Sequence, residues 1–198
     1  WPLAYWPDGS VKWMGFAATV SPTENFQLQP IAKRKNPEKL LVSDFADNMV
    51  VDNEIFTCKI SKKGKVLFDN ISIKNKVVSE NGRLICTLEK REKLNERIIS
   101  YDDFESKINE VKLEQSGAVR AVVKISGVFL SAQSGREIFP FTVRLYFYKG
   151  ATSIKMVHSF VYDGNQDKDF IKGLGVVFDV PMREAEYNRH VRFSGENG

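Results

Sequence analysis

Apolar and polar residues alternate with a period of two along most of this chain. The clearest stretch has large apolar residues at Phe141, Val143, Leu145 and Phe147, and Thr142, Arg144, Tyr146 and Tyr148 between them. This alternation is typical of a β-strand with one face in a hydrophobic core. Further strands are predicted near residues 54–60, 64–69, 71–78, 84–91, 95–101, 107–114, 118–130, 153–162 and 171–180.

Glycine and Asx turns separate these segments, which favours antiparallel pairing of consecutive strands. They fall at Lys63–Gly64, Asn81–Gly82, Ser116–Gly117, Ser134–Gly135, Lys149–Gly150 and Asp163–Gly164. No stretch keeps a helical period for more than about two turns, and in the charged segment 89–96 Leu94 alone cannot anchor a helix. The pattern predicts an all-β fold, a large antiparallel β-sandwich of the supersandwich kind.

The first residues predict a turn followed directly by a strand. Pro7, Asp8 and Gly9 suit a tight turn, and Val11 and Trp13 begin the strand that follows it. We interpret residues 1–20 as the end of a preceding β domain, and both ends of the chain as cuts. Residues 21–39 contain three prolines and are predicted to be a linker, so the sandwich domain is expected over residues 40–198.

Composition narrows the classes of partner. Apolar residues make up 42% of the chain, enough for a substantial core, and no apolar run is long enough to cross a bilayer. A formal net charge of +4 from 29 basic and 25 acidic residues is spread along the sequence, so neither nucleic acid nor a membrane is expected as a partner. Cys58 and Cys86 each lie in a predicted strand, and both buried free thiols and a cross-strand disulfide remain open.

The densest polar cluster lies near the C-terminal end, at Tyr187, Asn188, Arg189, His190 and Arg192. If these residues formed a strand, Asn188, His190 and Arg192 would share one face. A histidine between cations keeps its imidazole neutral near pH 7 and suits a general base, and an arginine beside it can hold a carboxylate. The alternative is a set of interdomain hydrogen bonds without a catalytic role.

Two further sets of residues are candidates for substrate binding. Arg144, Tyr146 and Tyr148 lie on one strand face, and they offer rings for stacking on sugars and donors for hydroxyls or a carboxylate. The alternative is an amphipathic face that packs on a neighbouring domain. His158 lies on an otherwise apolar strand face, where a core histidine is the competing interpretation.

The segment Asp163 to Asp169 has oxygen-bearing side chains at alternate positions, as a calcium-binding loop does. Lys168 occupies the sixth position, where a calcium loop needs glycine, and Leu174 occupies the twelfth in place of glutamate. A polar turn is therefore expected. Neither a metal nor another cofactor is predicted.

Three motifs together resemble a known family. They are Trp6-Pro7-Asp8-Gly9-Ser10-Val11-Lys12-Trp13, then His158-Ser159-Phe160-Val161-Tyr162-Asp163-Gly164 with Asp169-Phe170-Ile171-Lys172-Gly173-Leu174-Gly175, and finally Asn188-Arg189-His190-Val191-Arg192-Phe193. In this order and spacing they are similar to the exo-rhamnogalacturonan lyases and their YetA-like relatives. The resemblance covers the end of an N-terminal barrel-like domain and the central β-sandwich domain, and implies that the family's C-terminal α/α toroid is missing here.

The resemblance implies a secreted or periplasmic bacterial protein that acts on pectic rhamnogalacturonan, an acidic polysaccharide, by β-elimination. That reaction needs a cation at the C5 carboxylate, a base for the C5 proton and an acid for the leaving oxygen. Arg189 or Arg192 suits the first role, His190 the second and Tyr187 the third. The chain alone is predicted to be inactive. The alternatives are a non-catalytic carbohydrate-binding or scaffolding sandwich and a mutarotase-like sugar epimerase.

Overall fold

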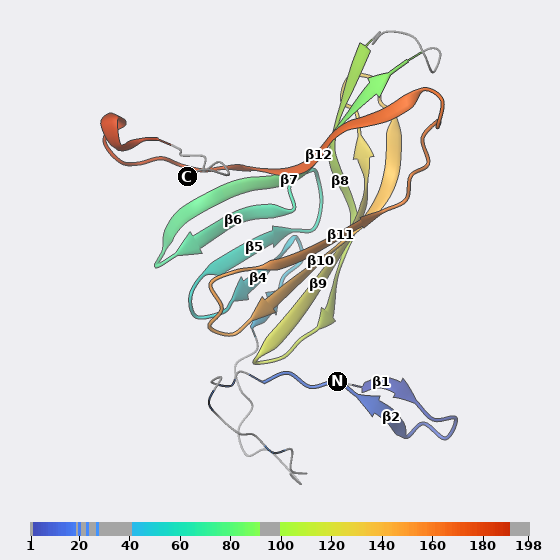
Figure 1. Cartoon of the computed structure of the whole chain (residues 1–198). Coiled ribbons are helices and arrows are strands. Elements are labelled where there is room, and N and C mark those ends of the chain that lie inside the picture. The colour runs from blue at the N-terminus through green and yellow to red at the C-terminus, as the bar shows by residue number, and fades with distance from the viewer. Residues whose placement is uncertain are drawn as a thin grey trace.

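The computed structural model describes residues 2–18, 20, 23, 27, 41–91 and 100–190, and these residues are almost entirely β-structure (Figure 1). The predicted linker, residues 21–39, lies almost wholly outside them. The strands are β1 (Pro2–Tyr5), β2 (Val11–Met14), β3 (Val42–Asp44), β4 (Asn48–Asp52), β5 (Thr57–Ser61), β6 (Phe68–Ile73), β7 (Lys76–Lys90), β8 (Ser100–Gln115), β9 (Arg120–Leu130), β10 (Glu137–Tyr148), β11 (Lys155–Phe160) and β12 (Asp169–Asp179). A short 3₁₀ helix, η1, covers Glu186–Asn188.

Strands β1 and β2 form an antiparallel hairpin around the predicted turn. The Asp8 carboxylate accepts hydrogen bonds from the Ser10 amide at 2.9 Å and the Ser10 hydroxyl at 2.7 Å, and Gly9 takes a φ of 83°. That positive φ is the conformation for which glycine is suited. The hairpin leaves large apolar side chains exposed, with Trp6 at 51% and Trp13 at 63%.

Strands β3 to β12 join in one antiparallel network of ten strands, with the order β11-β10-β9-β8-β7-β6-β5-β4-β3 and with β12 paired to β7. Strand β7 pairs with three other strands and so connects the parts of the network. Its residues 76–82 pair with β6 and its residues 85–90 pair with β8, while β12 runs along the opposite edge over residues 80–90. Because β6 and β8 share one edge of β7, the network folds into two layers at this strand, which confirms the predicted sandwich architecture (Figure 1).

A buried serine closes the ladder at the point where β7 passes from one layer to the other. Ser106 is 1% exposed. Its hydroxyl accepts a hydrogen bond from the Leu84 amide at 3.0 Å and donates one to the Lys65 carbonyl at 2.6 Å. A backbone group buried without a partner costs free energy, so this hydroxyl stabilises the fold at the corner.

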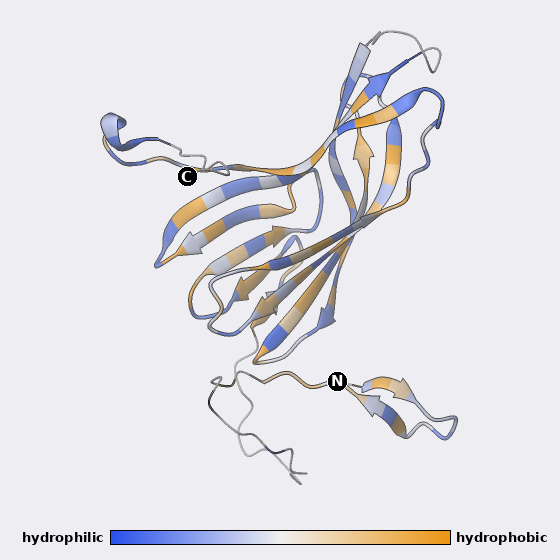
Figure 2. Cartoon of the chain, viewed as in Figure 1, coloured by the Kyte–Doolittle hydropathy of each residue, from blue (hydrophilic) through white to orange (hydrophobic). Residues whose placement is uncertain are grey.

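The core lies between the two layers and is made by the alternating residues of both. Figure 2 shows the apolar and polar bands that alternate along the strands. The ring centroid of Phe147, in β10, lies 6.5 Å from that of Phe56, which immediately precedes β5. The fully buried large side chains include Phe104, Phe129, Phe139, Ile60 and Leu88. Cys58 and Cys86 are buried in this core as free thiols.

Asn53 fastens the two layers together at one end. This residue is 0% exposed. Its amide nitrogen donates to the carbonyls of Tyr148 at 3.1 Å and Ala151 at 2.8 Å, and its amide oxygen accepts from the backbone amides of Ile55 and Phe56. All of the hydrogen-bonding capacity of this buried side chain is therefore used, which is the condition for burying an amide without loss of stability.

The turn predicted at Asn81–Gly82 is not a chain reversal. Both residues lie inside β7, where Asn81 has a φ of 53° at the bend between the layers. The reversal occurs earlier, at Lys74 and Asn75, whose φ values of 49° and 63° join β6 to β7 in a two-residue hairpin. In the described ranges no helix is long and apolar enough to span a bilayer.

Candidate functional site

The C-terminal cluster lies at the surface. Tyr187 and Asn188 belong to the 3₁₀ helix η1, so they do not form the strand considered above, and Tyr187 is 85% exposed. The Arg189 guanidinium donates to the Glu184 carbonyl at 2.6 Å, and His190 is exposed. Arg192 lies outside the described residues. Asn188 and Arg189 line a shallow hollow with strand β7 residues such as Val77.

The β10 face holds its three predicted residues together but engages them with protein partners. The Arg144 guanidinium donates to both carboxylate oxygens of Glu114, at 2.8 Å and 3.0 Å, and this contact lowers the pKa of Glu114. The guanidinium of Arg120 lies 5.2 Å from the ring centroid of Tyr146 and 5.7 Å from that of Tyr148. Cations therefore cover ring surface that a sugar would need for stacking.

His158 lies on the other side of the sheet. It pairs across β11 and β10 with the core residue Val143, whereas Arg144 pairs with the outward-facing Val157. The rings around the imidazole belong to Phe129, Phe141 and Phe160, all with centroids within 6.1 Å. Its Nε2 has no hydrogen-bond partner in the described part of the chain, and burial lowers the pKa of His158. The predicted site residues thus fall in three separate places.

The loop considered for calcium turns its oxygen atoms toward protein donors. Asp163 accepts from the Phe139 amide at 2.7 Å, and the Asn165 side chain accepts from the Asp167 amide at 2.9 Å. Asp169 accepts two hydrogen bonds from Arg136, at 2.9 Å and 2.5 Å. Among the described residues, no group of three acidic, histidine or cysteine side chains is arranged to hold a metal ion.

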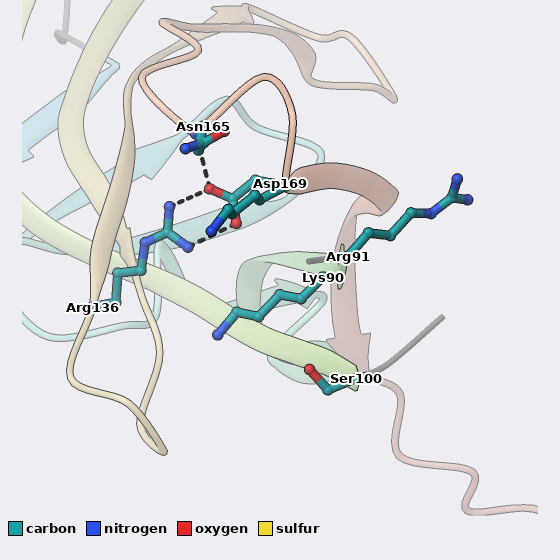
Figure 3. Close-up of a pocket in the computed structure, with 7 residues that line it drawn as sticks. Lys90, Arg91, Ser100, Arg136, Asn165 and Asp169 are labelled. Carbon is teal, nitrogen blue, oxygen red and sulfur yellow. Dashed lines mark hydrogen bonds and ion pairs between the residues drawn. The ribbon is translucent and has the colours of Figure 1, made fainter. Parts of the chain in front are cut away.

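A pocket of about 390 Å³ lies beside this loop, at the end of the sandwich where β7, β8 and β12 meet the β9–β10 turn. Its lining is rich in cationic groups: Lys90, Arg91, Ser100, Arg136, Asn165, Lys168 and Asp169. Figure 3 shows Arg136 pointing at Asp169, with Lys90 and Arg91 extending in opposite directions, as neighbouring residues of a strand do.

Buried carboxylates fix two of these cations. Asp102 is 3% exposed and lies 2.8 Å from the Lys90 ammonium, and Asp169 is 5% exposed and holds Arg136. Burial acts to raise the pKa of Asp102, but hydrogen bonds from Lys90 and Ser131 outweigh it and lower that pKa. The hydrogen bond from Arg136 lowers the pKa of Asp169. Both acids are therefore ionised at neutral pH and serve as anchors, not as proton donors.

Pattern reasoning along the sequence missed this pocket. Arg136 follows a turn, Lys90 ends a strand, and Asp169 begins another, so each has an ordinary local explanation. Only the pairing of β7 with β12 and the return of the β9–β10 turn bring them together. The polar pattern of residues 163–169 is visible in the sequence, but Asp169 within it binds Arg136 of the same chain.

Comparison with known proteins gives the family. The family model described as "PcRGLX-like protein central beta sandwich domain" matches residues 40–198, and the one described as "PcRGLX-like N-terminal RIFT barrel domain" matches residues 1–31. The chain belongs to the PcRGLX-like family. The resemblance inferred from the three motifs is thereby confirmed. In this PcRGLX-like chain, the β1–β2 hairpin lies within the barrel match and the cationic pocket within the sandwich match.

A curated relative agrees with this assignment. The uncharacterized protein YetA of Bacillus subtilis (strain 168) is 38% identical over 207 residues, an alignment that covers 100% of this chain. The PcRGLX-like chain spans 23% of the length of that relative.

Proposed function

We propose that this chain is the front part of a rhamnogalacturonan lyase-like protein, in which the sandwich helps to hold an acidic polysaccharide while the reaction takes place in a site shared with the rest of the protein. Membership of the PcRGLX-like family supports the reaction class. The single structural observation that carries the proposal is the cationic pocket at the end of the sandwich. Its donors suit the carboxylates that distinguish a pectic polymer from a neutral one.

The proposed reaction is β-elimination next to galacturonate. A base takes the C5 proton, a double bond forms between C4 and C5, and the bond from C4 to the glycosidic oxygen breaks with its electron pair leaving on oxygen, which an acid then protonates. We assign the base to His190, the cation at the C5 carboxylate to Arg189 or Arg192, and the acid to Tyr187. The exposure of Tyr187 and His190 supports a site completed by further parts of the protein.

The experiment is the appearance of unsaturated uronate absorbance with rhamnogalacturonan as substrate. The longer protein is expected to give the signal, and the 198-residue chain alone is expected to give none. In the longer protein, His190→Ala and Arg192→Ala are each expected to reduce the rate at least about a hundredfold, as removal of a general base or a charge-stabilising group does. Unchanged rates in both variants would remove these residues from the mechanism.

A second outcome separates the binding-module alternative. Sugar binding by the longer protein with no unsaturated product would support a non-catalytic module. The epimerase alternative requires a histidine beside a carboxylate, whereas the rings around His158 belong to Phe129, Phe141 and Phe160. No described contact therefore favours it.

A further inference from the structure

The pocket at the end of the sandwich has more free hydrogen-bond donors than acceptors. The Lys90 ammonium gives one contact to Asp102, at 2.8 Å, and an ammonium carries three hydrogens, so two remain available. The Ser100 hydroxyl and the Lys168 ammonium line the pocket without a side-chain partner among the described residues. A ligand that accepts hydrogen bonds at two or three adjacent oxygens would satisfy these groups.

The charge of the pocket limits the class of ligand. Three cations face it, and two of them are paired with carboxylates, Lys90 with Asp102 and Arg136 with Asp169. Lys168 is therefore the cation of the three that has no carboxylate partner among the described residues. Arg91 does not add to this count, because it is ion-paired with Glu89 and extends away from the other cations (Figure 3). One unpaired cation matches a monoanion such as a carboxylate. It does not match a nucleic acid, whose binding requires several phosphate contacts.

One of the donors, Lys90, is held in place before any ligand arrives. Asp102 accepts hydrogen bonds from Ser131 at 2.7 Å and Ser134 at 3.2 Å as well as from Lys90, so the acid that anchors this lysine is itself fixed. Asp169 is fixed in the same way by the Asn165 amide at 2.9 Å. An exposed lysine on an ordinary surface must lose conformational entropy when it binds, and anchoring reduces that cost. The anchored Lys90 ammonium and the fixed Arg136–Asp169 pair distinguish this hollow from a solvated charged face.

Tyr162 holds the loop that forms one wall of the pocket. Its hydroxyl donates to the Asp169 carbonyl at 2.7 Å, and its ring lies 4.9 Å from the Phe139 ring, centroid to centroid. A side chain added at Gly164 would place its Cβ 3.1 Å from the Tyr162 hydroxyl, so the loop packs closely on this tyrosine. The wall that carries Lys168 is thus part of the folded sandwich.

We propose that this pocket binds the carboxylate of a single uronate residue, with Lys90, Ser100 and Lys168 as the donors. The choice of a uronate sugar over another carboxylate rests on the proposed function. A volume of about 390 Å³ lies within the range of about 300–1,000 Å³ that ligand pockets occupy, and it suits one sugar ring with its neighbours outside. The pocket is a point of attachment for the polymer, and it takes no part in bond breaking.

The test is isothermal titration of the 198-residue chain with a rhamnogalacturonan tetrasaccharide and with its carboxyl-reduced, neutral analogue. Binding is expected for the acid and not for the neutral analogue, and the affinity for the acid should fall as salt is added. Lys168→Gln replaces an exposed ammonium by a neutral amide and breaks no ion pair of the described chain, so the fold should be retained. This variant is expected to bind the acid about tenfold more weakly. Lys63→Gln, at an exposed position in the β5–β6 turn, is the matched control and should bind like wild type.

Three results would overturn the inference: no binding of the acid, equal binding of the neutral analogue, or an unchanged affinity in Lys168→Gln. Inorganic phosphate is titrated in parallel, and an equal affinity for phosphate would make the pocket a general anion site and remove the uronate assignment. The proposed function is read out separately, by product formation in the longer protein. Binding without product would refute the lyase alone, and product with unchanged Lys168→Gln affinity would refute the pocket assignment alone.

Discussion

Replacing Asp169 by asparagine tests whether the buried carboxylate anchors the pocket. Asparagine has nearly the same shape and still accepts a hydrogen bond from the Asn165 amide, but it leaves Arg136 without its counter-ion. Breaking a buried ion pair by removing one partner costs about 3–5 kcal/mol. The Arg136 side chain is 34% exposed, so water recovers part of its hydration, and we expect a loss of about 2 kcal/mol in the free energy of unfolding.

The assay is urea unfolding at pH 7, followed by far-UV circular dichroism. Glu110→Gln is the matched control, because the Glu110–Lys112 pair has side chains 50% and 62% exposed and should cost less than about 0.5 kcal/mol. A loss in Asp169→Asn no larger than that of the control would refute the anchoring role.

The same variant has a signature in acid. Because the folded-state pKa of Asp169 is lowered, the ion pair contributes its full stability above the unfolded-state pKa, about 3.9, and this stability is lost as pH falls through the folded-state value. The difference in stability between wild type and Asp169→Asn should therefore stay constant from pH 7 to about pH 5 and shrink in more acidic solution. A difference that grew on acidification would contradict the assignment.

Three further predictions concern the core. Gly127→Ala would place a Cβ 2.2 Å from a backbone carbonyl oxygen of β8, so it should lower the free energy of unfolding by about 1–3 kcal/mol. The control Gly175→Ala, whose Cβ would meet nothing within 4 Å, should change that free energy little, and urea unfolding of both variants measures the difference. Because burial lowers the pKa of His158, the free energy of unfolding should be highest above about pH 6.5 and should fall as the pH drops below that value. His158→Phe should abolish this part of the pH dependence, and an unchanged dependence of the unfolding free energy on pH in the variant would contradict the prediction. Burial raises the pKa of Cys58 to about 12, and burial together with the Asp103 carboxylate raises that of Cys86 to about 11. Both thiols should therefore react with a thiol reagent at pH 8 only after the protein is unfolded in urea, and rapid labelling of the folded chain would contradict this.

The architecture could be read from the sequence because its signal is local. The alternation through Phe141, Val143, Leu145 and Phe147 depends only on which face of one strand is buried, and the structure buries all four. The bend in β7 was missed because Asn81 and Gly82 suit a reversal and a bend equally well. What distinguishes the two is the presence of β6 and β8 on the same edge, which is a tertiary fact.

The candidate site was harder to predict for the same reason. Arg144 and His158 lie on neighbouring strands, β10 and β11, that both alternate in polarity. Their side chains lie on opposite faces of the sheet, because His158 pairs with Val143 and not with Arg144. The pairing register of two strands cannot be predicted from a single sequence, and a shift of one residue moves a side chain to the other face of the sheet. Arg136 and Asp169 illustrate the converse, since residues 33 positions apart form a close pair without any local pattern.

All of the tryptophans of the chain lie in its first 13 residues, so the N-terminal part and the sandwich differ in their fluorescence. All three tryptophans of the chain are Trp1, Trp6 and Trp13, and the Lys12 ammonium lies 4.3 Å from the ring centroid of Trp6. Indole fluorescence therefore reports on residues 1–13 of the chain, and the tyrosines are the longest-wavelength chromophores of the sandwich. Excitation at the long-wavelength edge, where indole alone absorbs, follows these N-terminal residues, and far-UV circular dichroism is dominated by the ten-stranded network. Loosening of the N-terminal part and unfolding of the sandwich can thus be followed separately in one unlabelled sample.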